Sequence, residues 1–225
     1  ASALDIKPED LAAAREVGFT AALSLPPAGA VFRGQSALIS LRDGGDSRSL
    51  VLAADVAQHI ADDYPRFDFE AAPRSERLEI GYPASLMGSI ALKRQTLLNA
   101  RWAAAPAPAG ERREFSASLA ALAPVVSGRQ TVIANAPDEE DLPRLARLRD
   151  EFGLKLIAQG QGREYRQAAA LKRLALPVIV PLAYPAAPEV EQPESALDVP
   201  LDQLQHWERA PGNAAALQRA GVEFA

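Results

Sequence analysis

The sequence contains no cysteine, which excludes disulfides, zinc–thiolate sites and a thiol nucleophile. Only two histidines occur, His59 and His206, so there is no His-x-His pair and no second histidine at metal-ligand spacing from either one. No apolar run reaches the roughly 18 residues of a membrane-spanning helix, so we expect no membrane span. The lack of cysteine suits a cytoplasmic and a periplasmic protein equally, and the compartment stays open.

No block of like charge stands out among the 225 residues, which carry a formal net charge of −5. Acidic and basic side chains are interspersed, so the sequence predicts no basic surface for nucleic acid and fits ordinary solubility. About half of the residues are apolar, enough for one α/β barrel or two small domains. Because the chain begins at Ala1 rather than at Met, we expect it to be part of a longer protein.

One pattern recurs along the chain: an amphipathic helix, a Gly or Pro, and then a short apolar strand. Helices are predicted near 10–17, 138–152, 163–174 and 213–220, and strands near 19–25, 131–135, 154–158, 178–182 and 222–225. In the second helix Leu142, Leu145 and Leu148 share one face. Gly153 then ends that helix in the manner of a left-handed C-terminal cap. This alternation is typical of α/β proteins with a parallel sheet.

The number of predicted strands, five or six, is below the eight of a complete barrel. We therefore predict a single (β/α) barrel domain of the TIM type over residues 1–225, incomplete in this chain, with a hairpin insertion over 36–52. A doubly wound open sheet produces the same local pattern, but no Gly-rich phosphate loop opens any of the helices. A long helix is predicted over 85–102.

Three polar or Pro-rich segments interrupt the pattern, at 62–83, 103–111 and 184–198. The first two combine Pro and charge without an apolar period, so we expect them to be the least ordered parts of the chain. Glu189, Glu191 and Glu194 lie in the third. Such a cluster can bind calcium, but the interleaved prolines favour a solvated loop.

Several segments together resemble the imidazolonepropionase-like group of the amidohydrolase superfamily. They are 14–23, 32–38, 82–88, 131–135, 151–156 and 213–225, and they extend over most of the chain. The resemblance implies a metal-dependent hydrolase that acts on carbon–nitrogen bonds, other than peptide bonds, of small molecules. It also implies a divalent metal such as zinc, held by histidines at strand ends, and an aspartate that accepts a proton from metal-bound water.

The chain departs from this implied metal site at the strand ends. The resemblance places Asn135 and Gln159 where the group has histidines, and the final aspartate would follow Ala225. Amide oxygens are poor ligands for a transition metal, so we expect no metal and no other cofactor in this chain. Two interpretations stay open: an amidohydrolase-like hydrolase, or a catalytically silent amidohydrolase-fold domain with a binding or structural role.

Four side chains are candidates for a neutral, hydrogen-bonding ligand pocket: Arg33, Gln35, Asn135 and Gln159. Each follows a predicted strand, where barrel sites are built, and the expected ligand is a small polar or anionic molecule. Around Arg33 and Gln35 the alternative is a structural loop that fixes the hairpin. The sequence identifies no catalytic residue and no oligomeric state.

The remaining polar residues of interest have structural interpretations. His59 is predicted on a helix at the surface or the edge of the core, and His206 on a helix that packs through Trp207. Lys93 and Arg94, on the long helix, are expected to be solvated or paired with acidic side chains.

Overall fold

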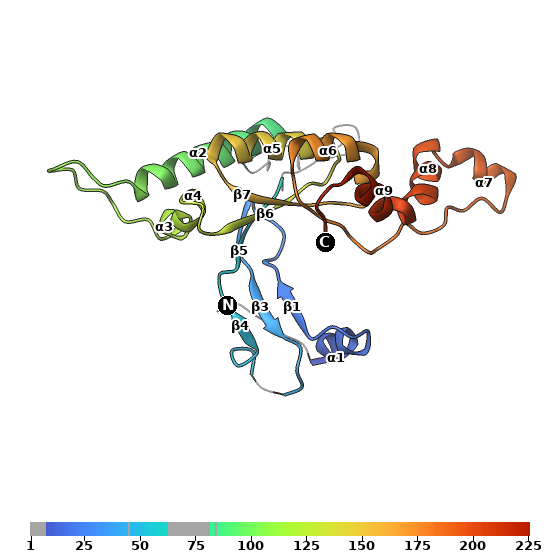
Figure 1. Cartoon of the computed structure of the whole chain (residues 1–225), viewed down its shortest axis with the longest axis horizontal. Coiled ribbons are helices and arrows are strands. Elements are labelled where there is room, and N and C mark those ends of the chain that lie inside the picture. The colour runs from blue at the N-terminus through green and yellow to red at the C-terminus, as the bar shows by residue number, and fades with distance from the viewer. Residues whose placement is uncertain (1–7, 45, 63–81, 84) are drawn as a thin grey trace, which may run out of the picture. The chain divides into compact units, whose positions relative to one another are not determined.

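The computed structural model describes residues 8–44, 46–62, 82, 83 and 85–225 (Figure 1). The strands are β1 (Ala21–Ser24), β2 (Phe32–Gln35), β3 (Ala37–Ser40), β4 (Val51–Ala53), β5 (Ala57–Ile60), β6 (Thr131–Asn135), β7 (Lys155–Gln159) and β8 (Val178–Ile179). The α-helices are α1 (Pro8–Glu16), α2 (Leu86–Ala104), α3 (Ala117–Ala121), α4 (Ala123–Val126), α5 (Asp141–Phe152), α6 (Ala168–Leu174), α7 (Pro193–Asp198), α8 (Leu201–Arg209) and α9 (Asn213–Ala220). The described residues also form the 3₁₀ helices η2 (Glu164–Gln167) and η3 (Ala210–Gly212).

The chain folds into two compact units. The first comprises residues 1–133 and 152–155, and the second comprises 134–151 and 156–225. The division passes through β6 and β7, so each of these strands belongs partly to both units.

A small antiparallel sheet in the first unit has the order β1-β3-β4. The predicted hairpin is confirmed, because β3 and β4 pair antiparallel. The prediction that 19–25 belongs to a parallel wall is wrong, since β1 pairs antiparallel with β3, with Ala21 opposite Ser40. An apolar run reports that a strand is at least partly buried, but it does not identify the neighbouring strand. Leu11 of α1 packs with Ile39, Leu41 and Leu50 to form the core of this region.

The second sheet is mixed and has the order β2-β5-β6-β7-β8. β2 and β5 are antiparallel, whereas β7 and β8 are parallel. The strand predicted at 222–225 is reduced to one parallel bridge between Val178 and Phe224. Within the described residues the two sheets are open and no closed barrel forms, so the structure confirms a mixed α/β fold with parallel strands but not a complete barrel.

Two local predictions in this sheet are wrong. Residues 32–35, expected to form a loop, are strand β2, and His59 lies on β5 rather than on a helix. The backbone of Gly34 has a φ of +109°, and the register of β2 shifts between Phe32 and Gly34. Glycine therefore permits an irregular strand at this position.

The helix that joins β6 to β7 agrees with its prediction. Leu142, Leu145 and Leu148 of α5 are all buried, and Gly153 after its last turn has the left-handed φ of +59°. Residues 132–134 of β6 are buried on successive positions, as in a strand covered on both faces. The β6-α5-β7 connection therefore has the composition of a β-α-β unit.

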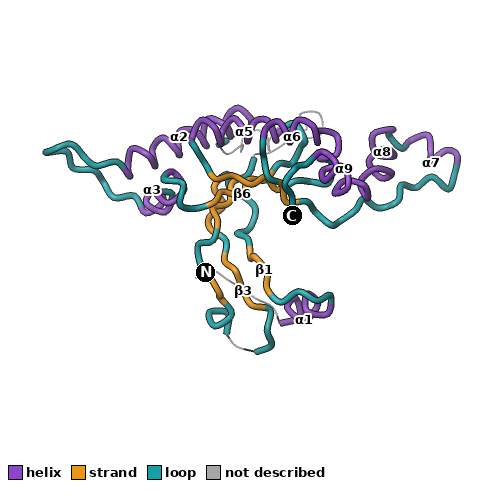
Figure 2. Tube along the Cα trace, viewed as in Figure 1, coloured by secondary structure: helices purple, strands orange, loops and turns teal. Residues whose placement is uncertain are grey.

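The loops fall partly outside the described residues. Of the segment predicted at 62–83, only residues 62, 82 and 83 are described, and its order stays a prediction. Residues 106–115 form neither helix nor strand (Figure 2), and Arg113 binds back to the carbonyls of Trp102 and Ala105. The segment predicted as a loop at 184–198 ends in helix α7.

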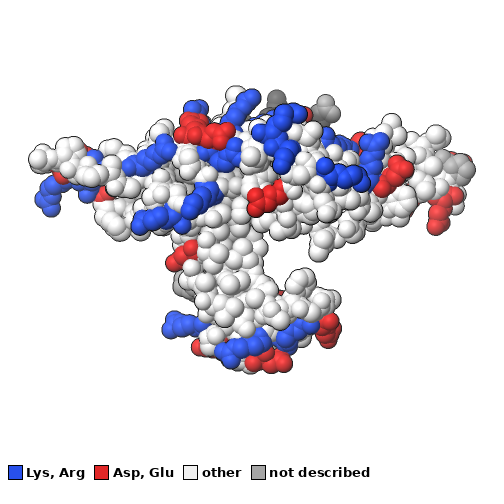
Figure 3. All heavy atoms as spheres, in the orientation of Figure 1, with Lys and Arg blue, Asp and Glu red and all other residues white. Residues whose placement is uncertain are grey.

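The surface side chains carry both signs of charge. On the face that Figure 3 shows, Lys and Arg are interspersed with Asp and Glu along the helices. Among the described helices none combines the length and the apolar composition needed to cross a bilayer.

Candidate pocket at the strand ends

The last residues of the strands of the second unit are aligned by backbone hydrogen bonds. Ala136 N, directly after β6, donates to the carbonyl oxygen of Gln159 at 2.9 Å, and Gly160 N donates to the carbonyl oxygen of Ile179 at 2.9 Å. The ends of β6, β7 and β8 therefore lie side by side. The loops that follow them, where parallel sheets place ligand sites, begin at one edge.

Asn135 takes part in an amide pair at this edge. Its Oδ1 accepts a hydrogen bond from Gln161 Nε2 at 3.2 Å. Gln161 is exposed and follows Gln159 by two residues, so the side chain after β7 reaches the last side chain of β6. Gln159 takes part through its backbone, because its carbonyl oxygen accepts the hydrogen bond from Ala136 N.

A buried carboxylate holds the loop after β7. Glu164 Oε1 accepts hydrogen bonds from the backbone N–H groups of Gln161, at 2.6 Å, and Gly162, at 3.0 Å. Its Oε2 accepts one from Asn213 Nδ2 at 2.6 Å, while Asn213 Oδ1 accepts one from Tyr165 N at 2.7 Å. Glu164 is 3% exposed, and with three donors it acts as an anchor for the loop.

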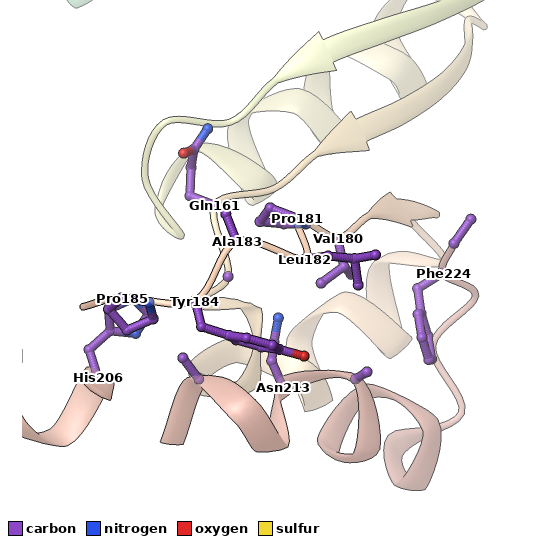
Figure 4. Close-up of a pocket in the computed structure, with 14 residues that line it drawn as sticks. Gln161, Val180, Pro181, Leu182, Ala183, Tyr184, Pro185, His206, Asn213 and Phe224 are labelled. Atoms are coloured by element: carbon purple, nitrogen blue, oxygen red, sulfur yellow. The ribbon is translucent and has the colours of Figure 1, made fainter. Parts of the chain in front are cut away.

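A pocket of about 70 Å³ opens beside this loop. Figure 4 shows residues 180–185 on one side of it and residues of α8 and α9 on the other. Its walls are mainly apolar and include Val180, Leu182 and Phe224. None of its lining residues is Asp, Glu, Lys or Arg.

His206 is the histidine of this pocket, and its surroundings favour the neutral imidazole. Burial lowers the pKa of His206 below its ordinary value, and the charges of Arg163 and Arg166 lower it further against the opposing carboxylates of Glu139 and Glu164. The ring stacks on Tyr165, with 6.2 Å between centroids, and its Nδ1 lies 3.4 Å from the Tyr165 hydroxyl. Burial and the neighbouring arginines therefore disfavour the charged form of this imidazole.

Arg33 and Gln35 lie in the first unit, on β2. Gln35 Nε2 donates to Gln130 Oε1 at 3.3 Å, and Gln130 directly precedes β6. Gly34, between them, is paired with His59, and the positive charge of Arg33 contributes to a lowered pKa of that histidine. The structure thus brings Asn135, at the last position of β6, to Gln161. Gln35 instead contacts Gln130, which precedes the first residue of β6.

Most residues of the pocket were not identified from the sequence. Gln161, Tyr184 and Asn213 belong to no motif, and His206 was interpreted only as a packing residue. Asn213 is the first residue of helix α9, after the N-cap Gly212, and no motif in the sequence marks its hydrogen bond to Glu164. The residues of the pocket are distant in sequence and come together only when the chain has folded, so no local pattern identifies them.

The part of the chain that the structure describes offers no set of side chains typical of a transition-metal centre. Among the described residues, no group of three or more His, Cys, Asp and Glu is placed to hold a metal ion. Asn135 already accepts a hydrogen bond through its amide oxygen, which is in any case a poor ligand beside imidazole.

Comparison with known proteins gives a likeness in structure alone. No protein family model matches the sequence, and no curated protein matches it. The structure is similar to that of an amidohydrolase from Thermotoga maritima MSB8, with a TM-score of 0.67 over 97% of this chain at 18% sequence identity. The fold is amidohydrolase-like. The chain spans about half of that amidohydrolase, 53% of its length.

Proposed function

We propose that this chain is the amidohydrolase-like portion of a hydrolase that acts on carbon–nitrogen bonds, other than peptide bonds, of small molecules. The likeness in fold to the Thermotoga amidohydrolase over 97% of the chain carries this proposal. The segments that resemble the imidazolonepropionase-like group support the same class. In this role Asn135 and Gln161 bind and orient the substrate at the strand ends.

A second candidate is a catalytically silent domain of the same fold that binds a small polar ligand. The amide pair of Asn135 and Gln161 favours it, because amides offer hydrogen bonds but not the ligand strength of imidazole. The predicted pocket without metal or other cofactor belongs to this proposal through Asn135 and Gln159, which end β6 and β7, whereas Arg33 and Gln35 lie on β2.

The two candidates are tested on purified full-length protein. Its metal content is measured by elemental analysis, and release of ammonia or ring opening is measured with a set of cyclic amides, amidines and linear carboxamides. Turnover of any of these compounds above the uncatalysed rate supports the hydrolase. Turnover of none of them, with a folded protein, contradicts the hydrolase and favours the silent domain.

Metal binding is then measured by calorimetry with zinc, manganese and iron at neutral pH. Stoichiometric binding that is lost in Asn135→Ala or Gln159→Ala would refute the metal-free interpretation of these strand ends. Binding that survives both substitutions places the metal on other residues of the full-length protein and leaves that interpretation intact.

A further inference from the structure

Gln161 is held at its backbone by the same loop that brings its side chain to the strand ends. Its Nε2 donates to Asn135 Oδ1 at 3.2 Å, and its own backbone N–H donates to Glu164 Oε1 at 2.6 Å. Gln161 is exposed, and a long exposed side chain samples many rotamers when its backbone is free to move. The contact between the two amides therefore depends on the backbone position that Glu164 sets.

Glu164 is in turn oriented by Asn213 of helix α9. Asn213 Nδ2 donates to Glu164 Oε2 at 2.6 Å, and Asn213 Oδ1 accepts from Tyr165 N at 2.7 Å. Both Glu164 and Asn213 are 3% exposed, so each depends on these protein partners rather than on solvent. A rotated Asn213 amide would set its Nδ2 against the Tyr165 N–H and its Oδ1 against the carboxylate. A single orientation of the amide therefore satisfies all of these groups.

The backbone on either side of Gln161 is confined as well. Gly160 N donates to the carbonyl oxygen of Ile179 at 2.9 Å, and a Cβ atom at position 160 would lie 2.6 Å from Glu164 Cδ. Gly162 has a φ of +86°, in the left-handed region, and its N–H donates to Glu164 Oε1 at 3.0 Å. The loop thus lies directly against the carboxylate, so a displacement of the carboxylate must displace the loop.

We propose that Glu164 and Asn213 are positioning residues: their hydrogen-bonded pair fixes the loop at 160–162 and thereby holds the Gln161 amide against Asn135 at the strand ends. The use of this amide pair for a ligand rests on the proposed function, whereas the positioning rests on the contacts alone. The pair also links helix α9 to the ends of β6 and β7.

An exchange of the donor and the acceptor within the pair tests this role. Glu164→Gln sets a second NH₂ group against Asn213 Nδ2, and Asn213→Asp sets a second carboxylate against Glu164. In the double variant E164Q/N213D the side-chain oxygen at position 164 still accepts from the loop, and its new NH₂ group donates to the new carboxylate at position 213. That carboxylate still accepts from Tyr165 N. The double variant therefore restores the hydrogen bonds that each single variant breaks.

The side-chain NH₂ signals of Gln161 in ¹H–¹⁵N NMR spectra of the full-length protein report on the amide pair, and their loss in Gln161→Ala assigns them. Each single variant is expected to move these signals to the positions of a freely rotating glutamine, and the double variant to return them most of the way to the wild-type positions. Lys172→Met is the matched control. It removes the 2.7 Å hydrogen bond from Lys172 Nζ to Gly221 O, which ties α6 to the end of α9, and it should leave the Gln161 signals in place.

A measurement on the wild type decides the question where the single variants do not fold. Although Gln161 is exposed, its backbone N–H donates to a buried carboxylate, so this N–H should exchange slowly with solvent. Glu189 is an exposed residue outside helices and strands, and its N–H has no partner among the described residues. The Gln161 N–H is expected to exchange about a hundredfold more slowly than that of Glu189, after correction for their intrinsic rates.

The inference is overturned if the Gln161 signals keep their wild-type positions in folded single variants, or if the double variant differs from the wild type as much as they do. Equal exchange of the Gln161 and Glu189 N–H groups overturns it too. Turnover of cyclic amides, amidines and linear carboxamides in the same samples reports separately on the proposed function. No turnover by any sample contradicts the hydrolase, while restored signals in the double variant still support the positioning pair. Turnover that both single variants retain in full overturns the role of the pair in the site and keeps the hydrolase.

Discussion

Lys93 shows how one residue joins two segments that are distant in sequence. It lies on the buried face of α2 and donates from Nζ to Asp62 Oδ1 at 2.6 Å, and Ser89 Oγ donates to the same oxygen at 2.6 Å. The side chains of Lys93 and Asp62 are 3% and 6% exposed. The sequence predicted a solvated or an acid-paired lysine, and the paired alternative is confirmed.

Breaking this pair is expected to be costly. Lys93→Met leaves the buried Asp62 carboxylate without its counter-charge, which should lower the free energy of unfolding by about 3–5 kcal/mol. Arg94→Met, at the exposed neighbouring position, should change it by less than about 1 kcal/mol. Urea unfolding curves measure both variants. Equal effects of the two substitutions would mean that the pair contributes nothing.

His59 makes the stability of the fold depend on pH. It is 3% exposed, its Nε2 has no hydrogen-bond partner among the described residues, and burial together with the charge of Arg33 lowers its pKa. A histidine with a lowered pKa stabilises the folded state above the unfolded-state pKa of about 6.5, and this contribution is lost as the pH falls below that value.

Unfolding midpoints measured from pH 8 to pH 5 test this expectation. The wild type should lose stability below about pH 6.5, by at most about 1.4 kcal/mol per pH unit for each such histidine. His59→Leu should reduce this slope. His206→Leu serves as the comparison, because the pKa of His206 is also lowered and its removal leaves the His59 contribution in place. An unchanged slope in His59→Leu would show that His59 is not the titrating group.

At the scale of elements, the loop after β7 depends on the close approach of its backbone to Glu164. A Cβ atom at position 160 would lie 2.6 Å from Glu164 Cδ and still closer to Oε1. Glycine is therefore favoured at position 160 by the space that Glu164 leaves rather than by its φ angle. No pattern in the sequence reveals this, because the crowding side chain is Glu164, which a hydrogen bond from the distant Asn213 holds in place.

Gly160→Ala is expected to displace the Glu164 carboxylate and to lower the free energy of unfolding by about 1–3 kcal/mol. Gly212→Ala is the matched control: Gly212 has a negative φ of −89°, and a Cβ there meets nothing within 4 Å. The control should be neutral or slightly stabilising. Thermal unfolding compares the two. A neutral Gly160→Ala would mean that Glu164 moves away at no cost.

The helices and buried strands of the second unit were largely predictable, because the spacing of apolar residues and the Gly or Pro at the ends of elements are local signals. Strand β6 and helix α9 have the predicted bounds, and α5 buries the predicted leucines. Strand pairing was not predictable to the same extent. Residues 21–24 and 32–35 are half-buried, and nothing in their composition specifies an antiparallel neighbour.

The candidate site was predicted in part for the same reason. Strand ends are local features, so Asn135 and Gln159 were placed correctly at the ends of β6 and β7. The pocket requires the loop at 180–185 to meet α8 and α9, and that contact depends on tertiary packing.

At the scale of the whole molecule, the described residues differ widely in how firmly they are packed. In the second unit, β7 and α5 have almost inaccessible residues, among them Ala158 and Leu142, whereas α8 has no buried residue. Leu197 and Leu201 in α7 and α8 are 87% and 69% exposed. Elements with few buried apolar contacts open at low free energy, so their amide hydrogens exchange with solvent early.

Hydrogen–deuterium exchange followed by mass spectrometry should therefore rank the segments of the second unit. Peptides from α7 and α8 are expected to exchange orders of magnitude faster than peptides from β6 and α5, because their backbone hydrogen bonds are covered by few apolar side chains. Helix α9 serves as an internal reference, since Leu217 is fully buried on a helix of similar length to α8. Protection of α8 equal to that of α9 would contradict the prediction.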